Sequence, residues 1–161
     1  MKQRVLILGS ALIILALAAG IVVTKENTLR EGSCVLLPLR PVDPRSLLQG
    51  DYMALAYQLE DDVKKLSLPP KGRLVVRLDD HDVASFVRID NGTSLSDDER
   101  YLKFTNTGTP RVAPHSFFFE EGTGERYAGA KYGELRVDGD GNAILTHLRD
   151  KEFKRIVPET P

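Results

Sequence analysis

The residues whose types and spacing come closest to a metal site are Asp138, Asp140 and Asn142, which offer oxygen ligands at alternating positions. An EF-hand calcium loop opens in this way. Its sixth position, however, must be glycine and is here Ala143, and its twelfth must be glutamate and is here Arg149. The segment therefore predicts a polar hairpin turn, and we expect no metal there.

A second polar group, residues 79–82, surrounds His81 with three aspartates. Consecutive side chains in a turn point in different directions and seldom converge on one ion, so the group predicts a solvated turn. His115 and His147 lack any spacing that defines a catalytic triad, whose members are recognised by geometry. The sequence thus predicts neither a cofactor nor a metal, and it identifies no catalytic residue.

A Ser-Lys hydrolase of the signal-peptidase type is the remote enzymatic alternative, with Ser46 as its nucleophile. In those enzymes the serine lies about seven residues before a Gly-Asp pair, within a Ser-x-x-Pro-Thr pattern. Here Gly50 follows four residues after the serine and the pattern is absent. A partner lysine such as Lys64, Lys65 or Lys103 would need to be desolvated, and each is expected to be exposed.

The amino-terminal part of this 161-residue chain predicts a membrane anchor. Residues 5–23 contain no charge, and a helix of that length reaches about the thickness of the hydrocarbon core. Lys2 and Arg4 precede it, so the positive-inside tendency places the amino terminus in the cytoplasm and the following domain in the periplasm. The expected division is 1–4 cytoplasmic, 5–23 inner-membrane anchor, 24–32 juxtamembrane tether and 33–161 exported domain.

A cleavable signal peptide is the alternative, because a basic start and Ala16-Leu17-Ala18 provide the required features. The apolar run continues to residue 23, which favours a retained anchor. A lipoprotein is disfavoured because Cys34 follows a charged, non-lipobox context; this single cysteine is expected to be buried. With 22 basic and 23 acidic residues, the chain has no basic excess that would recruit nucleic acid.

The exported domain is predicted to be mainly β, a β-rich α+β fold of about eight short, mostly antiparallel strands with one short helix. A capping-box spacing at Ser96 to Glu99 adds at most one helical turn. The expected strands are 34–39, 51–58, 73–78, 83–89, 101–105, 116–120, 134–137 and 142–148, and the expected helix is 125–131.

The strand 51–58 is expected to have one core face and one flat face, because its side chains alternate. The core face holds Met53, Leu55, Tyr57 and Leu59, and the flat face holds Tyr52, Ala54, Ala56 and Gln58. Before it, Gly50 relieves the backbone at the loop exit. Asp51 is expected to accept hydrogen bonds from Arg45, in the turn that Asp43 opens, and so to lock loop to strand.

Residues 50–57, GDYMALAY, resemble the GDYXXLXY family of bacterial membrane-anchored proteins, with Gly50, Asp51, Tyr52, Leu55 and Tyr57 at its fixed positions. The lead-in PVDPRSLLQ and the segment 117–143 are similar to the family's as well. The resemblance implies an exported, anchored protein, often encoded beside polytopic membrane proteins. It brings no assigned activity and no catalytic residue.

We therefore expect an accessory or interaction subunit of an integral membrane protein complex. Its expected contact surface combines Tyr52, Ala54 and Ala56 with the aromatic run Phe117, Phe118 and Phe119. The alternative is a periplasmic domain that senses a ligand or the state of the envelope, with a pocket that includes the same aromatic residues.

Overall fold

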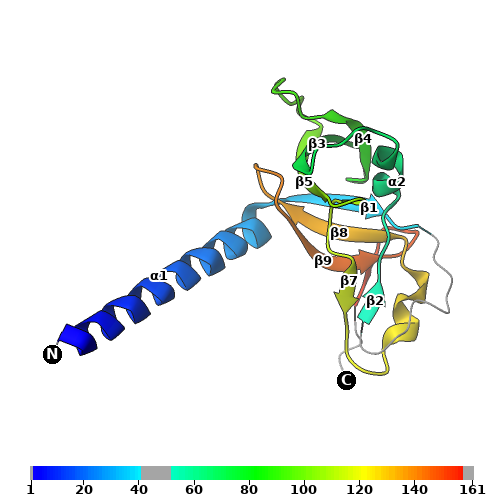
Figure 1. Cartoon of the computed structure of the whole chain (residues 1–161). Coiled ribbons are helices and arrows are strands. Elements are labelled where there is room, and N and C mark those ends of the chain that lie inside the picture. The colour runs from blue at the N-terminus through cyan, green and yellow to red at the C-terminus, as the bar shows by residue number, and fades with distance from the viewer. Residues whose placement is uncertain (1, 41–51, 158–161) are drawn as a thin grey trace.

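A long amino-terminal helix projects from a β-rich domain in the computed structural model, which describes residues 2–40 and 52–157 (Figure 1). This helix, α1 (Lys2–Glu31), is apolar and long enough to cross a membrane between Gly9 and Glu31, and none of its most apolar stretch is buried. The segment expected as a tether, 24–32, is helical as far as Glu31. Its role as a tether stays a prediction.

The domain is built from two four-stranded sheets and one two-stranded ribbon, all with antiparallel pairing (Figure 1). The first sheet has the order β1-β8-β9-β10: Ser33–Pro38, Tyr132–Val137, Ala143–Arg149 and Arg155–Ile156. The second has the order β4-β3-β5-β6: Ala84–Ile89, Lys71–Leu78, Glu99–Asn106 and Pro110–Arg111. The ribbon pairs β2 (Tyr52–Ala54) with β7 (Ser116–Phe118).

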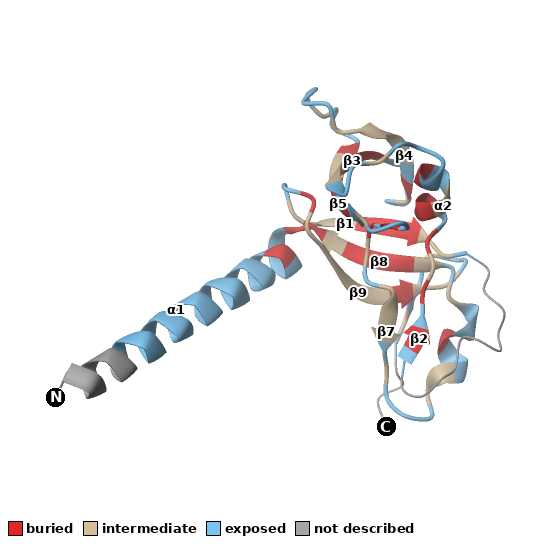
Figure 2. Cartoon of the chain, viewed as in Figure 1, coloured by how far each residue is buried: buried red, intermediate tan, exposed pale blue. Residues whose placement is uncertain are grey.

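One hydrophobic core joins the two sheets and the short helix α2 (Gln58–Lys64). Alternate residues of β1, β3 and β5 point into it, as the period-two pattern requires. Figure 2 shows consecutive buried residues along β1, β8 and β3, because the residues between the core positions are covered as well. The fully buried members include Val35, Leu37 and Leu135 from the first sheet, Leu74, Val76 and Leu102 from the second, and Val63 from α2.

The predicted β-rich class is confirmed, with local differences. There are ten short strands among the described residues, and the strand expected over 51–58 is the short β2, after which α2 begins at Gln58. The helix expected over 125–131 is a 3₁₀ helix, Gly124–Gly129. The capping-box residue Glu99 does accept from the Ser96 N–H at 3.2 Å, but it starts β5 instead of a helix.

The end of α1 is packed tightly against the domain at the turn between β8 and β9. Thr28 is buried, and its hydroxyl, which donates to the Thr24 carbonyl at 3.0 Å, lies 3.4 Å from Asp138 Oδ2. Arg136 Nη1 donates to the Gly32 carbonyl at 3.2 Å. A Cβ on Gly32 would overlap the Thr28 carbonyl oxygen and approach the Val137 backbone to 3.1 Å, so only glycine fits. The helix thus joins the domain without a loose linker.

Candidate functional site

The GDYMALAY segment is described from Tyr52 onward, and its role in the fold is visible from there. Four of the expected motif residues, Asp43, Arg45, Gly50 and Asp51, lie outside the described residues, so the expected Asp51 to Arg45 contact stays a prediction. β2 pairs with β7 so that Tyr52 lies opposite Phe118 and Ala54 lies opposite Ser116.

The two faces expected for this segment are present. Met53, Leu55 and Tyr57 are all buried in the core. On the other face Tyr52 is 38% exposed and Ala54 is exposed. The alternation therefore holds up to Tyr57, where an antiparallel bridge to Leu39 ends the extended stretch before α2 begins.

Tyr57 holds the motif segment to two other parts of the chain. Its ring is fully buried, and its hydroxyl donates to the Pro114 carbonyl at 2.6 Å. A Cβ on Gly133 of β8 would lie 3.1 Å from the Tyr57 ring, so glycine at this position admits the aromatic side chain. Burial raises the pKa of Tyr57, and the nearby Glu60 carboxylate raises it further. The phenol therefore stays protonated and acts as a hydrogen-bond donor.

A buried carboxylate supports the same loop from the side of α2. Glu60 is 6% exposed; both its oxygens lie 2.9 Å from His115 Nε2, and Oε1 also accepts from the Val112 N–H at 2.9 Å. The His115 carbonyl in turn accepts from the Leu55 N–H at 2.8 Å. Glu60 and Tyr57 thus fix the lead-in to β7 against the motif strand.

The three aromatic residues 117–119, all expected on the contact surface, divide between the inside and the outside. Phe117 and Phe119 are partly buried against Tyr127, with ring centroids 5.2 Å and 5.1 Å apart. Phe118 is 74% exposed, and its ring lies 5.9 Å from that of Tyr52. We call Tyr52, Ala54 and Phe118 the aromatic ribbon. Ala56, also expected there, is partly buried.

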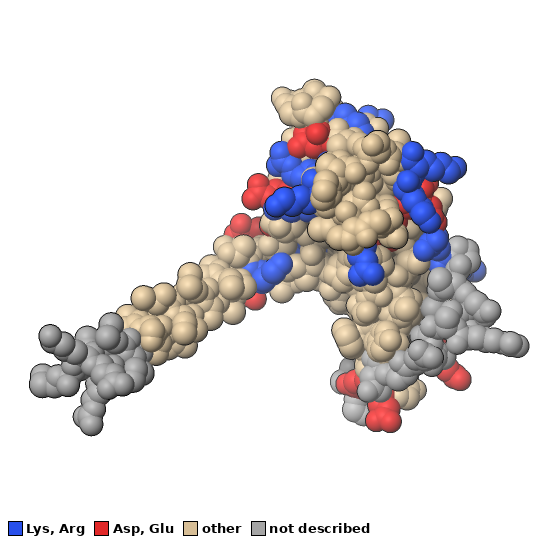
Figure 3. Space-filling model, in the orientation of Figure 1, with Lys and Arg blue, Asp and Glu red and all other residues tan. Residues whose placement is uncertain are grey.

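An open apolar groove of about 670 Å³ separates this ribbon from the end of α1. Lys25 and Leu29 of α1 form one side, Phe118 of β7 forms another, and β9 residues from Ala143 to Thr146 lie between them. The space between the helix and the lower part of the domain is visible in Figure 3. An exposed apolar surface thus lies directly beside the domain end of the apolar helix.

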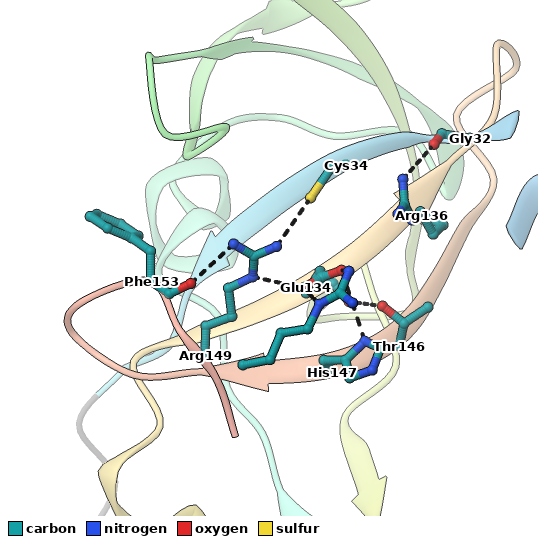
Figure 4. Close-up of polar contacts among 9 residues, drawn as sticks. Gly32, Cys34, Glu134, Arg136, Thr146, His147, Arg149 and Phe153 are labelled. Carbon is teal, nitrogen blue, oxygen red and sulfur yellow. Dashed lines mark hydrogen bonds and ion pairs between the residues drawn. The ribbon is translucent and has the colours of Figure 1, made fainter. Parts of the chain in front are cut away.

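A separate ion cluster is formed by Glu134 of β8, Arg149 of β9 and Arg155 of β10, and Figure 4 shows the Glu134 and Arg149 side chains pointing toward one another. Glu134 precedes the core residue Leu135 in β8, so its side chain lies on the opposite side of the sheet. Arg149 Nε and Arg155 Nη2 each lie 2.6 Å from a Glu134 oxygen, and the Glu134 side chain is fully buried. Burial opposes its ionisation, but the two arginines outweigh burial and lower the pKa of Glu134 to about 2. The carboxylate is therefore ionised and fully paired.

Two further residues border the ion cluster without forming a reactive pair. Arg149 Nη2 approaches Cys34 Sγ at 3.8 Å, but burial and then Glu134 raise the pKa of Cys34, so the thiol keeps its proton. Cys34, which was expected to be buried, is partly buried. Burial and Arg155 lower the pKa of His147. This cluster was not predicted from the sequence, where its only signal is the alternate polar positions in the 132–149 hairpin.

The two aspartate-rich segments form turns that their own backbone amides stabilise. Asp79 Oδ1 accepts from the N–H groups of His81 and Val83, both at 2.9 Å. Asp138 Oδ1 accepts from Asp140 at 3.0 Å and from Asn142 at 2.8 Å. Within residues 2–40 and 52–157 no three His, Cys, Asp or Glu side chains converge as metal ligands would.

Comparison with known proteins gave one match, to a protein-family model. A family model described as "GDYXXLXY protein" matches residues 14–148, which include α1's apolar stretch and nearly all of the domain. A search of curated proteins and a search of solved structures each found no match.

Proposed function

The chain belongs to the GDYXXLXY family, and from this premise we propose that it is a single-pass anchored accessory subunit of an integral membrane protein complex. In this proposal α1 crosses the inner membrane with its amino terminus in the cytoplasm, and the β-rich domain lies in the periplasm. The aromatic ribbon contacts the exposed face of a polytopic partner.

The observation that carries the proposal is the position of the aromatic ribbon beside an apolar, solvent-exposed helix. Phe118 is 74% exposed and pairs with the partly exposed Tyr52, although large aromatic side chains usually find a protein neighbour. Aromatic residues are enriched at the centres of protein interfaces. Because α1 is joined to the domain without a linker, a protein that packs along the side of α1 that carries Lys25 and Leu29 also comes close to this ribbon.

The rest of the motif fits a supporting role in this proposal. Tyr57 and Leu55 are buried and hold β2 against the loop before β7. Their contribution is then to orient Tyr52 and Phe118 toward the partner. We propose the same supporting role for Asp43, Arg45, Gly50 and Asp51.

Site-specific photo-crosslinking in cells tests this proposal. A benzophenone amino acid replaces Phe118 in the full chain, and the matched control replaces Leu66, which is 39% exposed and lies just after α2. We expect one integral membrane protein to be crosslinked from position 118 and not from position 66. Equal adducts from both positions, or a full chain that purifies in mild detergent without any membrane protein, would refute the subunit role.

Mass spectrometry of the amino terminus tests the anchor separately. We expect a mature chain that still contains residues 5–23. A chain that begins after Ala18 would identify a cleaved signal peptide and remove the basis for packing along α1.

A further inference from the structure

A second groove, of about 510 Å³, lies on the surface between α1 and the second sheet and is lined by basic side chains. We call it the cationic groove. Lys25 comes from α1, Lys71 from β3, Lys103 from β5 and Arg111 from β6. Basic residues far apart in sequence are thus brought to one place, although the chain as a whole has a net charge of −1.

The pairing of the strands explains why these cations share one surface. Lys71 of β3 and Arg111 of β6 both lie directly opposite Thr105 of β5. Lys103 is two residues from Thr105 on the same strand, so its side chain emerges on the same face. Three cations are therefore grouped around one exposed threonine.

These cations lack acidic partners within the groove. No aspartate or glutamate of the described residues lines it, and no ion pair or hydrogen bond within 2–40 and 52–157 engages the side chains of Lys25, Lys71 or Arg111. Lys103 Nζ donates to Asn142 Oδ1 at 2.9 Å. Two carboxylates contact residues that line the groove, and both are already bound there: Glu60 to Val112 and His115, and Asp138 to Asn142. Figure 3 shows basic side chains at the domain end of the helix and on the adjoining domain surface, with acidic side chains also present on this face.

The cationic groove continues into the apolar groove described above, since both are lined by Lys25, Pro114 and Ala143. A ligand that fits both spaces carries a negative group joined to an apolar portion. The grooves also begin at Lys25, only two residues beyond the uncharged run 5–23. They therefore lie at the level where lipid headgroups surround the proposed anchor.

We propose that the cationic groove binds the phosphate of an anionic membrane lipid, whose apolar portion occupies the apolar groove. Lys71, Lys103 and Arg111 contact the phosphate oxygens, and Lys25 closes the site from α1. The inference rests on the proposed function, because it places the domain at the surface of the membrane that α1 spans. The lipid would fix the height and tilt of the domain on that surface.

Lipid binding by the full chain in a zwitterionic detergent tests the proposal. Native mass spectrometry measures retention of phosphatidylglycerol and of phosphatidylcholine with the same short acyl chains. The groove variant is Lys71→Gln/Lys103→Gln/Arg111→Gln. The matched control, Lys64→Gln/Lys65→Gln/Lys154→Gln, removes the same charge from other exposed positions.

We expect the wild-type chain to prefer phosphatidylglycerol by at least about tenfold, since each basic residue near an anionic headgroup contributes several-fold to binding. The groove variant should lose this preference and the control should keep it. Equal retention of both lipids by the wild-type chain, or an unchanged preference in the groove variant, would overturn the proposal. Displacement of the lipid by millimolar inorganic phosphate, but not by chloride of equal ionic strength, would identify free phosphate as the ligand instead.

Carbonate extraction tests the proposed membrane anchor independently of lipid binding. Alkaline carbonate should leave the full chain in the membrane pellet, and its release would refute the proposed anchor without changing the lipid preference measured in detergent. Far-UV circular dichroism of both triple variants checks that they fold; we expect wild-type melting temperatures within a few degrees because all six side chains are exposed.

Discussion

Replacing Glu134 by Gln should destabilise the domain strongly at neutral pH and much less in acid. Glu134 is fully buried and contacts Arg149 and Arg155 at 2.6 Å, so its removal leaves two arginines beside an uncharged side chain. The lowering of its pKa from 4.5 to about 2 corresponds to about 3 kcal/mol of stability at pH 7. Because Arg155 is 42% exposed, solvent screening reduces this contribution, and we expect Glu134→Gln to lower the free energy of unfolding by about 2 kcal/mol at pH 7.

The pH dependence follows from the direction of that change. A carboxylate whose pKa is lowered on folding contributes its full stability above the unfolded-state pKa, near 4.5, and loses it as the pH falls toward about 2. The difference between the wild-type chain and Glu134→Gln should therefore be constant from pH 7 to pH 5. It should then shrink steadily between pH 4.5 and pH 2.

The assay is urea unfolding of the full chain in mild detergent, followed by far-UV circular dichroism between pH 7 and pH 2.5. Glu121→Gln is the matched control, because Glu121 is exposed and its replacement should change the free energy of unfolding by less than about 0.5 kcal/mol. A loss at pH 7 no larger than that of the control would contradict our reasoning. So would a large loss that is the same at pH 7 and pH 2.5.

Two substitutions with matched controls test how the motif and the hairpin turn are held. Tyr57→Phe removes the hydroxyl that donates to Pro114, and we expect a loss of about 1–2 kcal/mol in urea unfolding, whereas the exposed Tyr52→Phe should change little. A neutral Tyr57→Phe would show that the hydrogen bond is dispensable. Gly141→Ala should cost about 1–3 kcal/mol, because Gly141 has φ +87° and a Cβ would come 3.0 Å from the β5 backbone. Gly139→Ala, where a Cβ meets open space, should be nearly neutral, and equal effects at both glycines would refute the steric argument.

Much of the domain could be predicted because its strands have a local signal. The alternation in β3 and the turn between β8 and β9 both appear in the sequence, and the structure has them at nearly the predicted bounds. The short helix α2 was missed because it has only seven residues, and its buried Leu59 also fits the end of an alternating strand. The hydrogen bond from the Val112 N–H to Glu60 and the burial of Val63 stabilise the helix over a longer strand.

The polar sites were harder to predict because strand register brings them together. Arg149 and Arg155 meet Glu134 only through the order β8-β9-β10, and the register between β8 and β9 shifts at Glu134. The cationic groove likewise depends on β3 and β6 both flanking Thr105. A net charge close to zero excludes a basic protein, but it does not reveal how basic residues are distributed over the surface.

The tight junction between α1 and the domain means that the domain cannot swivel freely. Thr28 and Gly32, at the end of the helix, pack against the turn between β8 and β9. A helix turns by about 100° per residue, so one residue inserted before Thr24 would rotate the whole domain by about that angle relative to the preceding part of α1. The direction in which the aromatic ribbon faces around the helix axis is thus set by the number of residues in the helix. If α1 is the proposed membrane anchor, the number of residues in the helix decides which side of the domain faces a neighbouring protein in the membrane.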